Sequence, residues 1–94
     1  MILFCDNSTA ANDVRTQVII PFSRVFEIFV AGCRITINYN SGEYTYISDE
    51  KCIPKIESCS IRYNSEDSAN KAIRQFYKVC RDNGGVFYFS PNDK

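Results

Sequence analysis

The residues of this chain that could do chemistry are its five cysteines, because the sequence contains no histidine. Histidine is the commonest general base, nucleophile activator and metal ligand, so its absence removes three kinds of site together. The cysteines lie at positions 5, 33, 52, 59 and 80, and no two of them form a CxxC pair. A zinc site made of cysteines alone needs such close pairs. The sequence therefore predicts no metal site and no cofactor.

Cys52 is the one candidate for a nucleophile, because Lys51 and Lys55 flank it. A thiolate becomes reactive where neighbouring positive charge stabilises it. Catalysis would also need an oriented base, and the sequence has no GxGxxG, P-loop or GxSxG motif. We therefore interpret Cys52 as an incidental loop cysteine and predict that the chain has no catalytic residues and is not an enzyme.

A row of cations is the strongest polar pattern, formed by Lys71, Arg74, Lys78 and Arg81. Steps of three and four residues place side chains on one side of a helix. Such a row can contact phosphate or an acidic partner. It can equally be a solvated face whose later cations complement the C-terminus of the helix. We favour the solvated face and keep a nucleic-acid-binding stripe as the alternative.

The composition indicates one folded domain over residues 1–94. Hydrophobic residues make up 45 % of the chain, including seven Phe and six Tyr, which excludes a disordered class. Eleven basic and eleven acidic residues cancel, whereas nucleic-acid binders usually carry a basic excess. The odd number of cysteines, with no signal peptide or membrane-spanning run, is typical of a reduced, cytoplasmic setting.

One helix is expected over residues 65–82. Ser65 can cap its N-terminus, two acidic residues follow in the first turn, and Gly84 can take the left-handed conformation after its end. Its buried stripe would consist of Ala69, Ala72, Ile73, Phe76 and Cys80. Apolar runs and alternation predict further strands at 1–5, 17–22, 57–63 and 86–90, with loops over 6–13 and 48–55.

The stretch from Val25 to Ile47 predicts three short strands joined by two tight turns, at Ala31-Gly32 and Ser41-Gly42. A three-residue loop with a glycine bulge at Asn40-Ser41-Gly42 is the alternative for the second turn. The two-residue turns place one apolar set on a single face of the sheet. This predicted inner face comprises Phe26, Ile28, Val30, Cys33, Ile35, Ile37, Tyr39, Tyr44 and Tyr46.

The predicted outer face of this meander is mostly polar, but it includes Phe29 and Ile47, with Phe29 placed opposite Arg34. If the terminal strands leave this face bare, it would be a binding surface. The candidate partner-binding residues are therefore Phe29, Arg34, Ile47, Lys71, Arg74, Lys78 and Arg81.

The segment from Ile20 to Tyr46, IPFSRVFEIFVAGCRITINYNSGEYTY, resembles the opening of LytTR-type DNA-binding domains. The likeness lies in a strand, a hairpin and a glycine-containing turn. It covers less than a third of the chain, and nothing after Ile47 corresponds to the later helix and basic strand of that family. The resemblance implies a β-meander, and no binding residues are carried over from it.

Together these patterns predict an α+β fold, in which one helix from the C-terminal half packs on an antiparallel sheet of about five or six strands. The leading functional hypothesis is a non-catalytic cytosolic module that binds another protein or a second copy of itself. By association with other small stand-alone domains, it would be an inhibitor of a host protein, similar to anti-CRISPR proteins, encoded by a phage or mobile element and acting in the host cytoplasm. Nucleic-acid binding through the helix is the second hypothesis.

Overall fold

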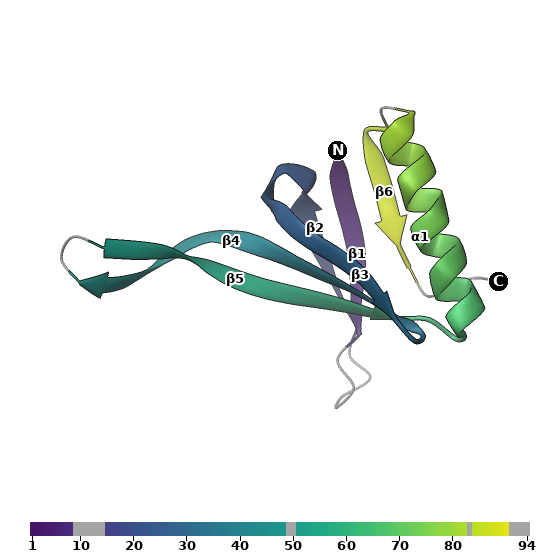
Figure 1. Ribbon diagram of the computed structural model, residues 1–94, viewed down its shortest axis with the longest axis horizontal. Helices are drawn as coiled ribbons and strands as arrows, with labels where there is room; N and C mark the ends of the chain where they lie inside the picture. Colours follow the sequence, from purple (N-terminus) through teal and green to yellow (C-terminus); the bar gives the residue numbers. More distant parts are fainter. Residues whose placement is uncertain (9–14, 49–50, 83, 91–94) are drawn as a thin grey trace.

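The computed structural model describes residues 1–8, 15–48, 51–82 and 84–90. The described part of the chain contains one α-helix, α1 (Glu66–Arg81), and six strands. Figure 1 shows α1 beside β6. The strands are β1 (Ile2–Ser8), β2 (Arg15–Pro21), β3 (Val25–Ala31), β4 (Arg34–Ser48), β5 (Lys51–Arg62) and β6 (Val86–Phe89). A 3₁₀ turn, η1 (Phe22–Arg24), joins β2 to β3. The α+β class and the helix in the C-terminal half are confirmed.

The six strands form two three-stranded sheets. Strand order is β2-β1-β6 in the first sheet and β3-β4-β5 in the second. The second sheet is an antiparallel meander, whereas β1 pairs antiparallel with β2 and parallel with β6. The parallel pair brings together strands from opposite ends of the sequence, and α1 lies in the long connection that leads into β6. The predicted loop over 6–13 is wrong in its first part, since β1 runs to Ser8, and residues 9–13 lie outside the described ranges.

The hydrophobic core lies where the two sheets and the helix meet. Alternation along the strands sends one set of side chains inward, and β1, β2, β4, β5 and β6 each contribute fully buried residues. The buried residues are Leu3, Cys5, Ile20, Ile35, Ile37, Cys59, Ile61, Tyr63, Ala69, Ile73, Phe76 and Phe89. Strands β1 and β5 are linked directly, because the backbone N–H of Ser60 donates to Asn7 Oδ1 at 3.2 Å.

The N-cap and the buried stripe of the helix follow the sequence signals, but the prediction of a left-handed Gly84 is wrong, because the glycines with positive φ are Gly32 and Gly42. The Ser65 hydroxyl caps the N-terminus by accepting a hydrogen bond from the Ser68 backbone N–H at 3.1 Å. The C-terminus closes where the Gly84 N–H donates to the Val79 carbonyl at 2.8 Å. A Cβ on Gly84 would lie 2.1 Å from Val79 Cγ1, so only glycine fits at this position.

The hairpin between β3 and β4 is shifted by two residues along β4 from the predicted register. Ala31 pairs with Arg34, so the turn residues are Gly32 and Cys33, with Gly32 at φ +62°. A shift by two residues keeps every side chain on its face, and Ile28 therefore still faces inward. Phe26 does not, because a β-bulge between Val25 and Glu27 leaves it 59 % exposed.

The predicted third strand of the meander is wrong. The chain does not turn back at Ser41-Gly42, and β4 continues to Ser48. Its partner is β5, which begins at Lys51, so the predicted loop over 48–55 is largely strand. Pro54 is compatible with this pairing because β5 is an edge strand, where proline is tolerated. Tyr44 and Tyr46, predicted as core, are 57 % and 79 % exposed.

The clearest test of the core is Phe76, whose ring contacts the rings of Phe22, Phe87 and Phe89 at centroid distances of 5.8, 5.5 and 5.3 Å. Phe76→Ala should lower the free energy of unfolding by about 3–5 kcal/mol, because it removes a buried ring and leaves a cavity. Urea titration followed by circular dichroism measures the change. The neighbouring Tyr77 is 56 % exposed, so Tyr77→Ala is the matched control and should cost less than about 1 kcal/mol. Equal effects of the two substitutions would show that the helix does not close the core.

Candidate functional site

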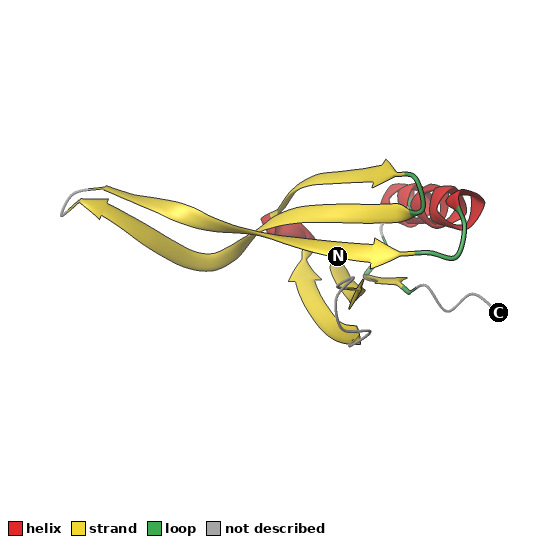
Figure 2. Cartoon of the chain, turned by 90° about the horizontal axis from the view of Figure 1, so that it is seen from below, coloured by secondary structure: helices red, strands yellow, loops and turns green. Residues whose placement is uncertain are grey.

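The outer halves of β4 and β5 extend away from the rest of the molecule as a twisted two-stranded ribbon (Figure 2). We call this ribbon, residues 40–48 and 51–57, the arm. The body of the molecule lies around α1 at the other end, and the longest extent of the chain is 51 Å (Figure 1). Every described side chain of β5 from Lys51 to Ser58 is exposed, so neither face of the arm packs on the body.

A bulge fixes the base of the arm. The register of β4 on β5 shifts between Asn40 and Tyr44, and Gly42 takes φ +88° there. Asn40 Oδ1 accepts from the Gly42 N–H at 2.9 Å, and the Ser41 hydroxyl donates to the Lys55 carbonyl at 3.1 Å. Asn40, Ser41 and Gly42 are the residues that the sequence indicated for a turn or a glycine bulge. The bulge is present, but the chain continues forward through it.

Arg24 of η1 lies against this bulge. Its Nη1 donates to the Ser41 carbonyl at 3.4 Å, and a Cβ on Gly42 would lie 2.9 Å from the same nitrogen. Glycine at this position therefore allows both the left-handed backbone and the approach of the guanidinium. The bulge and Arg24 together hold the arm at its base.

The two faces of the arm differ in chemistry. Residues directly opposite one another share a face, and Tyr44 pairs with Pro54, Tyr46 with Cys52 and Asn40 with Ile56. We call the set Tyr44, Tyr46, Cys52, Pro54 and Ile56 the apolar arm face. The opposite face carries Lys55, whose Nζ lies 3.6 Å from Glu43 and 3.9 Å from Glu57. These exposed ion pairs keep one face of the arm hydrated while the other presents uncharged side chains.

Tyr39 and Glu57 mark the boundary between body and arm. They pair directly, and the Tyr39 hydroxyl donates to Glu57 Oε2 at 3.2 Å. Partial burial, then the hydrogen bond to Glu57 and its negative charge, raise the pKa of Tyr39 to about 12. This phenol is therefore a reporter of order at the base of the arm.

The residues predicted to bind a partner do not form one surface. Phe29 and Arg34 lie on the face of the β3-β4-β5 sheet that points away from the helix, but Phe29 pairs with Thr36 and not with Arg34. Arg34 instead lies between Ala31 and Arg62. Phe29 is 41 % exposed, because the terminal strands form their own sheet and do not cover this face. Ile47 lies in β4, and its side chain is outside the described part.

The four helix cations, Lys71, Arg74, Lys78 and Arg81, are all exposed on α1. The ion pairs found among the described residues all involve Lys55, so none of these four helix cations is ion-paired there. The helix packs on the inner face of β3-β4-β5, so this stripe and Phe29 lie on opposite sides of the molecule.

The cysteines differ in exposure: Cys5 and Cys59 are buried, Cys33 and Cys80 are half-buried and Cys52 is exposed. The hydrogen bond that Cys5 donates to Cys59, together with burial, raises the pKa of Cys5, and the same hydrogen bond lowers the pKa of Cys59. Cys52 is exposed on the apolar arm face. Neighbours along a strand point to opposite faces, so Lys51 does not direct its charge toward the Cys52 thiol. The electropositive setting that a reactive Cys52 would need is not built.

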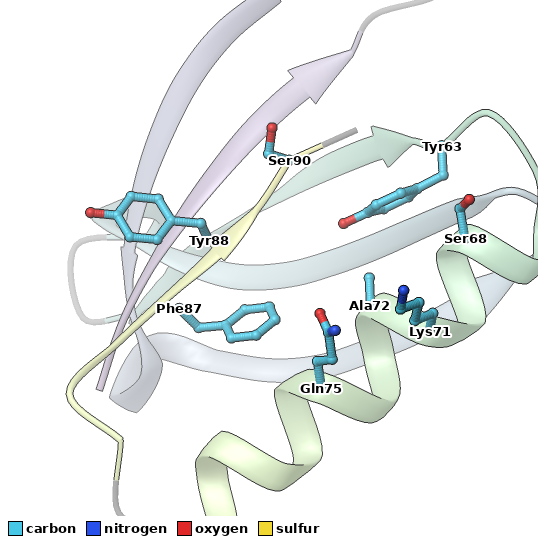
Figure 3. Close-up of a pocket in the computed structure, with 8 residues that line it drawn as sticks. All are labelled: Tyr63, Ser68, Lys71, Ala72, Gln75, Phe87, Tyr88 and Ser90. Carbon is cyan, nitrogen blue, oxygen red and sulfur yellow. The ribbon is translucent and has the colours of Figure 1, made fainter. Parts of the chain in front are cut away.

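A small pocket lies between α1 and β6 (Figure 3). Its volume is about 200 Å³, below the usual range of about 300–1,000 Å³ for small-molecule sites. The Tyr63 ring and the Phe87 ring line it from the sheet side, and Lys71 and Gln75 line it from the helix.

Two general properties complete the description. Among the described residues, no group of three or more Cys, Asp or Glu side chains is placed to hold a metal ion. No helix in the described ranges is long and apolar enough to cross a membrane.

Comparison with known proteins finds no matching family model, curated protein or solved structure. The segment that resembles LytTR-type domains spans the end of β2, η1, β3 and part of β4, so it contains one hairpin of the meander.

Sequence reasoning missed the apolar arm face. It assigned Tyr44 and Tyr46 to the core because it turned the chain back at Ser41-Gly42, which placed them opposite Tyr39 and Ile37 on the inner face. In the structure β4 runs on through the bulge, so Tyr44 and Tyr46 pair with Pro54 and Cys52 on the face of the sheet that points away from the helix. The pairing of β4 with β5 decides this, and alternation within one segment does not encode it.

The boundary at Tyr39 gives a pH test. A pKa raised to about 12 means that the folded chain holds the phenol proton more tightly than the unfolded chain does. The resulting stability is complete below the ordinary pKa of about 10 and is lost as the pH rises through about 12. Tyrosinate absorbance at 295 nm should show a late-titrating tyrosine that disappears in Tyr39→Phe and titrates earlier in Glu57→Gln. Tyr46→Phe, at an exposed site, should leave it in place; disappearance of the late step in that variant instead would contradict the assignment.

Proposed function

We propose that this protein is a non-catalytic protein-interaction module whose binding element is the arm. The observation that carries the proposal is the exposure of the apolar arm face, with Tyr46 at 79 % and Tyr44 at 57 %. An isolated two-stranded hairpin is marginally stable in water, and aromatic side chains dominate the energetics of protein interfaces. A partner that covers this face would bury the tyrosines and stabilise the ribbon.

A protein partner fits the arm better than a nucleic acid does. The described arm carries two lysines, and Lys55 is already paired with Glu43 and Glu57. Phosphate contacts supply most of the affinity for nucleic acid and need free cations in excess. The apolar arm face has no charge, which is the composition of the centre of a protein interface.

The finer form of the proposal is an inhibitor. A projecting arm can insert into a groove of a larger host protein while the body remains outside, and this is one physical route to blocking a surface. A host-directed inhibitor of this kind, encoded by a phage or mobile element and acting in the cytoplasm, is the specific hypothesis that partner identification would address.

The arm hypothesis predicts which substitutions abolish capture of a partner. Tyr46→Ser and Tyr44→Ser should each reduce partner recovery from a lysate of the source cells by about tenfold or more, because each removes an anchor of the interface. Tyr77→Ser is the matched control, since Tyr77 is 56 % exposed on the helix. Quantitative mass spectrometry of the captured proteins measures the difference. Recovery of the same proteins by all variants would show that the arm is not the binding element.

Nucleic-acid binding is the second candidate function. It rests on the four exposed cations of α1, which have no ion-pair partner within the described residues. The formal net charge of zero weakens this candidate, because acidic residues elsewhere on the chain repel phosphate at long range.

The helix stripe can be tested by reversing its charge. If the stripe binds nucleic acid, Lys71→Glu, Arg74→Glu and Lys78→Glu combined should abolish a gel shift. In single variants, the slope of log K against log salt should fall by about 0.9 for each phosphate that the protein no longer neutralises. Lys51→Glu combined with Lys55→Glu is the control, since it reverses charge on the arm. An unchanged shift in the triple variant would eliminate this function.

A further inference from the structure

Two cysteines contact each other where the two sheets meet. Cys5 lies in β1 of the β2-β1-β6 sheet, and Cys59 lies in β5 of the β3-β4-β5 sheet. Both side chains are fully buried, and the thiol of Cys5 donates a hydrogen bond to the sulfur of Cys59. The pair is therefore a direct contact between two sheets that share no strand.

The spacing of β1 and β5 suits a covalent link. Next to the pair, the Asn7 side chain reaches across from β1, and its Oδ1 accepts from the Ser60 backbone N–H at 3.2 Å. One short side chain and one hydrogen bond therefore span the gap between these strands. A disulfide joins Cα atoms about 4.4–6.8 Å apart, which is a similar span. Cys5 points the same way as Asn7, because the two lie two residues apart in one strand.

The surroundings of the pair are apolar. Cys5 lies between Val18 and Phe89 in its own sheet. Cys59 lies opposite Ile37 in the other sheet. A disulfide replaces the S–H donor and its sulfur acceptor together, so formation of the bond leaves no unsatisfied polar group in this part of the core.

We propose that Cys5 and Cys59 form an oxidation site, which a hydroperoxide converts into a disulfide that joins the two sheets covalently. The inference goes beyond the proposed function of the arm and does not depend on it. While the thiols are reduced, the two sheets are held together by packing and hydrogen bonds. Once the disulfide has formed, β1 and β5 cannot separate, even in the unfolded chain.

The reaction proceeds in two displacements, of which the first takes place at Cys59. The hydrogen bond from Cys5 lowers the pKa of Cys59, so Cys59 is the thiol that attacks as a thiolate. Its sulfur bonds to one oxygen of hydrogen peroxide, the O–O bond breaks, and the leaving hydroxide takes up the Cys59 proton and departs as water. Cys59 is then a sulfenic acid.

The second displacement uses the proton and the sulfur of Cys5. The Cys5 sulfur bonds to the Cys59 sulfur, the S–O bond breaks, and the hydroxide leaves with the Cys5 proton as a second water. Two thiols and one hydrogen peroxide thus give one disulfide and two waters. The thiols lose two electrons and the peroxide gains them.

Burial determines which oxidant reacts and which cysteines pair. Both sulfurs lie inside the core, and hydrogen peroxide is close to water in size, whereas a thiol-exchange protein is far too large to enter. The exposed Cys52 lies opposite Tyr46 and so has no second thiol across the ribbon. Its oxidation therefore stops at the sulfenic acid or links two chains.

Peptide mapping tests the link directly, because trypsin separates all five cysteines. Cleavage after Lys and Arg places Cys5 in peptide 1–15 and Cys59 in peptide 56–62, and the other three in 25–34, 52–55 and 79–81. The Cys52→Ser chain is treated with hydrogen peroxide, its remaining thiols are blocked with iodoacetamide, and the digest is analysed by mass spectrometry. The expected product is peptide 1–15 joined to peptide 56–62, at their summed mass less two hydrogen atoms.

The same treatment in concentrated urea is the control for the role of the fold. In the unfolded chain the four remaining cysteines should link in several combinations, whereas the folded chain should give the one pair. Separately alkylated peptides from the folded chain would overturn the inference. Links from Cys5 or Cys59 to Cys33 or Cys80 in the folded chain would overturn it as well.

Thermal unfolding tests the covalent joining of the sheets. The oxidised Cys52→Ser chain should melt at least about 10 °C above the reduced chain, and dithiothreitol should reverse the shift, because the link closes a long loop. Adding Cys33→Ser should keep the shift, and adding Cys5→Ala should abolish it. Circular dichroism checks that both variants fold, and the comparison of oxidised with reduced chain needs neither of them. A linked chain that melts at the temperature of the reduced chain would overturn the proposal.

Discussion

The structure depends on how little of the β3-β4-β5 sheet one helix can cover. Figure 1 shows α1 running across one end of this sheet, beside β6, while the outer halves of β4 and β5 extend away from it. The fifteen residues of β4 extend about 50 Å, and Ile73 and Phe76 of α1 close the core only at its inner end. Beyond Tyr39 and Glu57 the sheet has no cover, and the projecting arm is the direct consequence.

The exposed arm stays ordered through polar contacts that are individually weak. Lys55 pairs with two glutamates on one face, and the bulge at Gly42 with Arg24 fixes the base. Surface ion pairs contribute little each, so the arm belongs to the low-stability end of the structure. Binding can reshape or immobilise such an element at small energetic cost.

The sequence predicted the directions of side chains well up to Tyr39 and wrongly beyond it. Period two placed Ile28, Ile35 and Ile37 on one face, and a two-residue error in the first turn left that face unchanged. The N-cap at Ser65 and the buried stripe of α1 were local signals that the structure confirms, whereas Gly84 does not take the predicted left-handed conformation. The single-residue bulge that exposes Phe26 and the forward path through Gly42 depend on long-range pairing between β3, β4 and β5, which alternation does not encode. The split into two sheets depends on the parallel pairing of β1 with β6, which lie at opposite ends of the sequence.

The candidate residues predicted from the sequence do not include the apolar arm face, and the two sets differ in how visible they are in the sequence. The helix cations were prominent because charge at helical spacing is visible in sequence, but exposed cations are screened by salt and gain little without a charged partner. Tyr44 and Tyr46 were not predicted as a site because the expected turn at Ser41-Gly42 placed them on the inner face of the sheet. Burial of apolar area supplies about 25 cal/mol per Å², so an uncovered tyrosine offers more binding energy than a solvated lysine. The apolar arm face therefore offers a partner more binding energy per residue than the solvated helix cations do.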